Sequence, residues 1–131
     1  MKVCKFGGTS MANASTIKRV VNIIEDAPSR KYIVVSAPGK RNPADVKVTD
    51  ALYACFNEVQ KTGNCDSTFL TVAKRFHEIV NELGVDVDLD ENLKVIKEGI
   101  EASKTPDYAA SRGEYLSAKI LAAKLGFDFV D

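Results

Sequence analysis

Residues 32–35, with the sequence YIVV, form an uninterrupted apolar run in which three of the four side chains are β-branched. A strand without polar alternation is typical of a parallel sheet that is covered on both faces. Residues 3–6 (VCKF) have the alternation of side-chain character that is typical of a strand. They lead directly into Gly7 and Gly8. We therefore expect these two strands to be neighbours in an α/β fold, a three-layer sandwich with a mainly parallel sheet and helices on both faces.

The segments between and after these strands carry apolar residues with helical spacing. From Ile17 to Ile24, four of them fall at positions i, i+3, i+4 and i+7 of a helix that Asn13 can cap. The same spacing predicts helices over residues 49–63, 67–84, 91–103 and 111–126. A last strand is expected at residues 127–130, directly after Gly126.

Two features indicate what the surface of the protein does and does not bind. Residues 40–47 contain Pro43 and four charges without periodicity, which predicts a mobile surface loop. Lysine plus arginine and aspartate plus glutamate each number 18, so no net positive field would gather nucleic acid or an anionic membrane. We therefore expect a small-molecule or protein partner.

The length and the cysteines fit a single cytoplasmic domain. A chain of 131 residues is long enough for one domain with a buried core. Cys4, Cys55 and Cys65 form no Cys-x-x-Cys pair, which indicates reduced thiols. The first residues enter a strand without a signal segment, and no apolar run approaches the ~20 residues needed to span a bilayer. These features predict a cytoplasmic location.

The first candidate site is residues 5–10, with the sequence KFGGTS, between the first strand and the first helix. Paired glycines let backbone amides approach an anion, the helix N-terminus adds partial positive charge, and Lys5 supplies a full one. These properties suit a phosphate group. Turn formation alone is the alternative explanation of Gly7 and Gly8. The segment is not a Walker A loop, because its lysine precedes the glycines.

Two more candidate sites lie farther along the chain. Ser36 follows the second strand and, with Thr49, could hydrogen-bond a polar substrate at the carboxyl end of the sheet. Thr49 is equally explained as a helix N-cap. Ser111 and Glu114 have the spacing of a capping box, and the alternative is that Glu114 pairs with a ligand ammonium group. His77 is expected on a solvated helix face, and no cluster has the spacing of metal ligands.

Taken together, these segments resemble a known family. Residues 5–10 match the N-terminal signature of aspartate kinases, which are amino acid kinase family enzymes. Residues 34–37 (VVSA) and 48–52 (VTDAL) are similar to their second strand and threonine-containing turn. Residues 111–118 (SRGEYLSA) resemble their Ser-x-Gly-Glu-x-x-Ser-Ala helix start. The resemblance identifies residues 1–131 as the N-terminal, substrate-binding half of the kinase domain.

This resemblance implies phosphorylation of the β-carboxylate of L-aspartate by ATP, bound with Mg²⁺ as MgATP, at the entry to lysine, threonine and methionine synthesis. A catalytic Lys5 would neutralise charge on the transferred phosphoryl group, and Glu114 would face the substrate ammonium group. The residues against the ATP phosphates would be Lys5, Gly7, Gly8 and Thr9. The residues of the aspartate site would be Ser36, Thr49 and Glu114. The full-length enzyme would be a homo-oligomer, and no residue is implied as a metal ligand.

Aspartate kinases continue past a strand like residues 127–130 into a Gly-Arg-Gly-Gly-Ser-Asp segment, a nucleotide-binding half and regulatory ACT domains, which this sequence lacks. The arginine and aspartate of that segment would clamp the substrate carboxylate and orient Lys5, so we expect the isolated chain to be inactive. Two alternatives stay open. One is another enzyme of the family, acting on glutamate, acetylglutamate or a nucleotide. The other is a non-catalytic assembly or binding module that keeps half of the fold.

Overall fold

Strands β1 (Lys2–Phe6) and β2 (Arg30–Val35) form a two-stranded parallel sheet in the computed structural model, which describes residues 2–131. In their register, Phe6 pairs with Val35. Val35 is buried, and Phe6 and Ile33 pack against the core, so this face of the sheet is the inner one. The predicted pairing of the two strands is confirmed.

Helix α1 (Ala14–Glu25) returns the chain from the end of β1 to the start of β2. The Asn13 side chain accepts a hydrogen bond from the Thr16 N–H at 2.9 Å, and the Thr16 hydroxyl accepts one from the Asn13 N–H at 3.3 Å. This capping box confirms the predicted start of the helix. The apolar stripe predicted from spacing is buried, with Ile17 and Val20 each 2% exposed.

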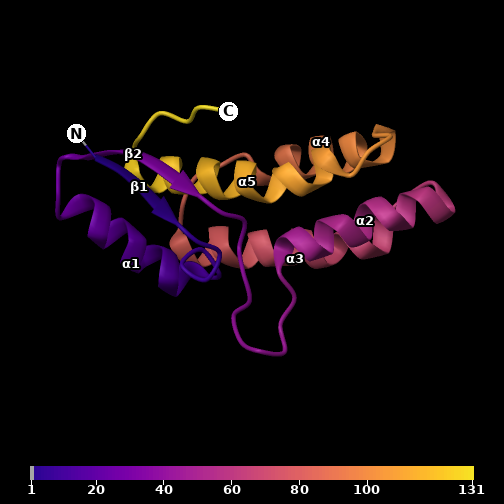
Figure 1. Ribbon diagram of the computed structural model, residues 1–131, viewed down its shortest axis with the longest axis horizontal. Coiled ribbons are helices and arrows are strands. Elements are labelled where there is room, and N and C mark those ends of the chain that lie inside the picture. Colours follow the sequence, from indigo (N-terminus) through magenta and orange to yellow (C-terminus); the bar gives the residue numbers. More distant parts are fainter. Residues whose placement is uncertain (1) are drawn as a thin grey trace.

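Four more helices follow in the described part of the chain: α2 (Val48–Thr62), α3 (Asp66–Leu83), α4 (Leu89–Ala102) and α5 (Asp107–Leu125). Helices α2, α3 and α5 each end at a glycine with positive φ, and these glycines are Gly63, Gly84 and Gly126. Glycine reaches positive φ without a steric penalty, so a glycine after a helical pattern indicates the end of the helix. These three predicted helix ends are confirmed. Figure 1 shows α2 and α3 running side by side, and the two helices pack together.

The predicted α/β architecture is confirmed. In Figure 1, α1 and α5 both lie beside β1 and β2, and α5 contacts both β2 and α1. Fully buried side chains such as Ile17 of α1, Leu52 of α2 and Phe76 of α3 fill the core between the elements. The carboxyl ends of both strands lead into the segments that precede α1 and α2, so these two segments share one edge of the sheet.

The predicted third strand at residues 127–130 is wrong, because this segment has no regular secondary structure. The Phe127 N–H donates to the Ala122 carbonyl at 3.0 Å, and the Phe129 ring packs edge-on against Tyr115 with centroids 5.3 Å apart. In Figure 1 the segment, in yellow, turns back along α5. A strand needs a hydrogen-bonded neighbour, and alternating residues alone do not supply one.

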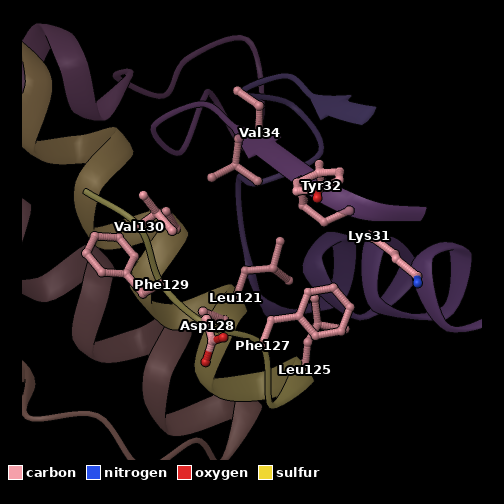
Figure 2. Close-up of a pocket in the computed structure, with 13 residues that line it drawn as sticks. Lys31, Tyr32, Val34, Leu121, Leu125, Phe127, Asp128, Phe129 and Val130 are labelled. Carbon is pink, nitrogen blue, oxygen red and sulfur yellow. The ribbon is translucent and has the colours of Figure 1, made fainter. Parts of the chain in front are cut away.

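The expectation that β2 is buried on both faces is also wrong. Tyr32 and Val34 are 53% and 50% exposed. They border a cavity of about 340 Å³, and Figure 2 shows Leu121, Leu125 and Phe127 on its opposite side. A sheet of two strands does not bring a complete layer of side chains to both faces of β2, so its outer face stays half-covered.

Candidate functional site

A cavity of about 390 Å³ opens at the carboxyl ends of β1 and β2. In parallel α/β sheets this edge is where ligands bind. The residues that line it are Gly8, Thr9, Ser36, Ala37, Pro38, Gly39, Lys40, Lys47, Thr49 and Glu114. The structure therefore brings five of the predicted site residues together, from segments that are far apart in the sequence. Those five are Gly8, Thr9, Ser36, Thr49 and Glu114.

Two predicted site residues, Lys5 and Gly7, do not line this cavity. Lys5 lies near the end of β1, where it pairs with Val34 of β2, and it is exposed. Because side chains alternate along a strand, Lys5 points away from the inner face on which Phe6 packs. Its catalytic role remains a prediction from the resemblance.

Gly8 and Gly39 hold two walls of the cavity in backbone contact. The Gly39 N–H donates to the Gly8 carbonyl oxygen at 2.8 Å. A methyl group on Gly39 would lie 2.7 Å from the carbonyl carbon of Gly8, which is too close for two carbon atoms that are not bonded. The turn after β2 therefore requires glycine here. At Gly7, by contrast, nothing lies within 4 Å of the place where a side chain would begin.

Gly39→Ala is expected to lower the free energy of unfolding by about 1–3 kcal/mol, because the added methyl group forces the two turns apart. The matched control is Gly7→Ala, which adds the same group where nothing obstructs it and should change that free energy by no more than about 0.5 kcal/mol. Urea denaturation of both variants measures the difference. Equal destabilisation would show that the contact between the turns is not what requires glycine.

Thr49 is not the N-cap of α2, so the capping interpretation is wrong. The helix begins at Val48, with Lys47 in the N-cap position and no side-chain cap. The Val48 N–H instead donates to the Pro38 carbonyl at 3.0 Å, so the turn after β2 satisfies one of the free amides of the helix start. Thr49 lies half-buried in the first turn and lines the cavity.

The capping-box interpretation of Ser111 and Glu114 is wrong as well. Helix α5 begins at Asp107, after Pro106, so both residues lie inside the helix. The Ser111 hydroxyl donates to the Tyr108 carbonyl at 2.8 Å. Proline is itself common at helix starts, and here Pro106 marks the start of α5 more accurately than the serine–glutamate spacing does. Glu114 is left exposed at the cavity wall.

Gly113 explains how α5 brings Glu114 to the cavity. A methyl group on Gly113 would lie 2.6 Å from Ala37 Cβ and 3.3 Å from Val48 Cγ1. Only a residue without a side chain lets α5 pack this closely against the turn after β2 and the start of α2. Because Glu114 follows directly, its side chain reaches the cavity that these segments enclose.

The model of the amino acid kinase family matches residues 1–127 of the chain. The chain belongs to this family. It is 36% identical to aspartokinase 3 of Bacillus subtilis over 129 residues and 33% identical to the chloroplastic aspartokinase 1 of Arabidopsis thaliana over 134 residues. Each match covers 94% of this chain but only 28% and 23% of those relatives. The chain therefore spans less than a third of the length of the aspartokinases it matches.

Solved structures agree with this assignment. The crystal structure of Clostridium acetobutylicum aspartate kinase is 46% identical and superposes with a TM-score of 0.95, over 98% of this chain and 30% of that one. Aspartokinase III of E. coli in complex with aspartate and ADP is 19% identical, with a TM-score of 0.68 over 95% of this chain and 28% of that one, and shares the fold. The resemblance inferred from the sequence is confirmed.

In this member of the amino acid kinase family, Arg75 of α3 contacts the segments around the cavity, and the sequence interpretation missed it. Its side chain is 6% exposed, and Nη2 donates to the carbonyls of Ala12 at 2.9 Å and Gly39 at 2.8 Å. Nη1 donates to the carbonyl of Val46 at 3.0 Å. Burial lowers the pKa of Arg75, although a guanidinium keeps its proton in proteins. All three partners lie in distant segments, so no local pattern pointed to this residue.

The loop of residues 40–47 is tied to α3, unlike the mobile surface loop that we predicted. Asp45 accepts a hydrogen bond from Arg41 Nε at 2.7 Å and lies 3.5 Å from Arg75 Nη1. Arg41 also reaches Glu78 of α3 at 3.0 Å. Hydrogen bonds from Arg41 hold the pKa of the Asp45 carboxyl well below its usual range. These contacts fix the loop whose two ends line the cavity.

The other candidate groups do not line the cavity. His77 lies on a solvated face of α3, as predicted, with Nε2 3.1 Å from Asp90. Cys4, Cys55 and Cys65 are free thiols, and burial raises the pKa of Cys55 to about 12. Within residues 2–131, no three His, Cys, Asp or Glu side chains are grouped so that they could hold a metal ion. None of the helices described combines the length and apolar character that crossing a membrane requires.

Proposed function

We propose that this chain is the substrate-binding half of an aspartate kinase. The complete enzyme would transfer the γ-phosphate of ATP to the β-carboxylate of L-aspartate, at the entry to lysine, threonine and methionine biosynthesis. One observation carries the proposal: the glycine turn, the end of β2, the start of α2 and Glu114 of α5 line one cavity. The relatives named above are aspartokinases, and one solved relative is in complex with aspartate and ADP.

The charges around the cavity suit an amino dicarboxylic acid. Glu114 provides one carboxylate, and Lys40 and Lys47 provide two ammonium groups. L-Aspartate carries one ammonium group and two carboxylates, so each of its charges has an opposite charge available at the cavity wall. Ser36 and Thr49 add hydroxyl groups, which can donate to a carboxylate oxygen. This balance supports Glu114 as the partner of the substrate ammonium group.

In phosphoryl transfer the protein mainly aligns the two substrates and stabilises negative charge, and it need not form a covalent bond to either substrate. Gly8 and Thr9 face the same cavity as the aspartate groups, so a phosphate bound against them would lie beside the substrate carboxylate. Lys5, at the end of β1, is the cation that we assign to the transferred phosphoryl group. We assign Mg²⁺ to the nucleotide, with which it would be bound as MgATP.

The proposal is tested by titrating the isotope-labelled chain with L-aspartate and following its amide resonances. We expect saturable shifts at Ser36, Thr49 and Glu114, which line the cavity, and none at His77, which does not. L-Asparagine should bind at least about tenfold more weakly, because it lacks the β-carboxylate charge and one charge-assisted contact is lost.

The same titration separates the alternatives. Tighter binding of L-glutamate or N-acetyl-L-glutamate than of L-aspartate would assign the chain to another enzyme of the amino acid kinase family. Failure to bind any of these ligands or MgATP would favour a non-catalytic assembly or binding module. Either outcome would contradict the proposal.

A further inference from the structure

A single guanidinium group joins three backbone segments around the cavity. Arg75 is almost completely buried, and its Nη2 donates to the carbonyl oxygens of Gly39 at 2.8 Å and Ala12 at 2.9 Å. Its Nη1 donates to the carbonyl oxygen of Val46 at 3.0 Å. Three acceptors from three different segments therefore depend on one side chain of α3.

Each acceptor lies in a different segment that contributes lining residues to the cavity. Gly39 lines the cavity itself, in the turn after β2. Ala12 closes the glycine turn, whose earlier residues line the cavity, and Val46 directly precedes Lys47, which lines it from the far end of the loop. Arg75 does not line the cavity, so it acts on the cavity only through these backbone contacts.

We propose that Arg75 is a positioning residue, whose fork of N–H donors fixes the glycine turn, the turn after β2 and the loop of residues 40–47 relative to one another. It thereby sets the shape of the cavity that would receive aspartate and phosphate. The inference rests on the proposed function only in treating this cavity as a substrate site.

Packing alone does not account for a cation at this position. Burying an ion is unfavourable unless hydrogen bonds and an opposite charge compensate for lost hydration. Asp45 compensates only in part, because its nearest oxygen lies 3.5 Å from Arg75 and is shared with Arg41. An apolar side chain would avoid this penalty but would donate to none of the three carbonyls. The planar fork of arginine addresses several acceptors in fixed directions, which the single ammonium group of lysine does not.

Arg75→Lys tests this role, because it keeps the charge and most of the length and is expected to fold. Amide hydrogen exchange reports on the walls, since the N–H groups of Gly39 and Val48 are bonded across them at 2.8 Å and 3.0 Å. We expect exchange at these two amides to accelerate at least about tenfold relative to Gly63, whose N–H is bonded to the last turn of α2. Asp45→Asn, which frees the loop but keeps the guanidinium, should give the same pattern with a smaller change.

Val80→Ala is the matched control, because it removes buried volume from the same helix without touching the three carbonyls. It should accelerate all three amides by similar factors. A uniform acceleration in Arg75→Lys, or unchanged exchange at Gly39 and Val48 in that variant, would overturn the proposal.

Ligand binding supplies a second readout for the same variants. At an equal interval below each variant's Tm, the Kd for L-aspartate should rise at least about tenfold in Arg75→Lys and stay unchanged in Val80→Ala. An unchanged Kd in Arg75→Lys would also overturn the role of Arg75 in substrate binding. If the unsubstituted chain does not bind aspartate, the proposed function is wrong. Hydrogen exchange is measured without ligand, so its pattern still decides whether Arg75 positions the walls of the cavity.

Discussion

The 131-residue chain is expected to show no measurable aspartate kinase turnover, even with saturating L-aspartate and MgATP. It corresponds to 28% of the length of aspartokinase 3 of Bacillus subtilis and to 30% of the solved Clostridium enzyme. Of the residues that line its cavity, our proposal assigns only Gly8 and Thr9 to phosphates. Alignment and charge stabilisation together account for many powers of ten in rate, and a chain that does not align the nucleotide loses both.

A coupled assay that traps aspartyl phosphate as its hydroxamate measures this turnover with the purified chain. A full-length aspartokinase in the same assay serves as the positive control. Turnover in the ordinary kinase range of about 1–100 per second would contradict the expectation and place a working nucleotide site within these 131 residues. Aspartate binding without turnover would support the assignment as a substrate-binding half.

Elements whose signals are local could be predicted from the sequence. The cap at Asn13 and the glycines that end α2, α3 and α5 act within one turn of the chain, and the structure confirms all of them. Two local interpretations were wrong, because α2 and α5 begin at Val48 and Asp107, ahead of the capping positions expected at Thr49 and Ser111. The two wrong predictions about the sheet have another cause, because they depended on partners that the local sequence does not specify. Residues 127–130 alternate in polarity as a strand would, but they have no strand to pair with. Tyr32 and Val34 belong to an apolar run that is typical of a buried strand, but no layer of side chains covers them fully.

The candidate site shows the same division between local and long-range information. The glycine turn and the Ser-x-Gly-Glu segment are recognisable as short motifs, and the fold brings Gly8 and Glu114 to one cavity. Arg75 carries no such signal, because its three acceptors come from turns and loops whose positions only the tertiary structure defines. Lys40 and Lys47 were assigned to a mobile loop, and they reach the cavity because ion pairs fix that loop to α3.

Glu114→Gln is expected to weaken L-aspartate binding by about ten- to hundred-fold while thermal stability stays near that of the parent chain. Glu114 is exposed and takes no part in capping α5, which begins at Asp107, so neutralising it should not disturb the helix. The substitution removes one charge-assisted contact to the substrate ammonium group, worth about 1.5–3 kcal/mol. Since about 1.4 kcal/mol corresponds to a factor of ten, a titration of both chains resolves the expected change in Kd.

Succinate distinguishes the ammonium subsite from a general disturbance of the cavity. It has the two carboxylates of aspartate but no ammonium group, so its affinity for Glu114→Gln should be unchanged or higher, because a repelling charge has been removed. Glu98→Gln, on the exposed surface of α4, is the matched control and should bind aspartate as the parent chain does. If Glu114→Gln bound aspartate normally, Glu114 would have no place in the proposed site. If aspartate and succinate binding weakened together, the substitution would be acting on the whole cavity, and the assignment of Glu114 to the ammonium group would be wrong.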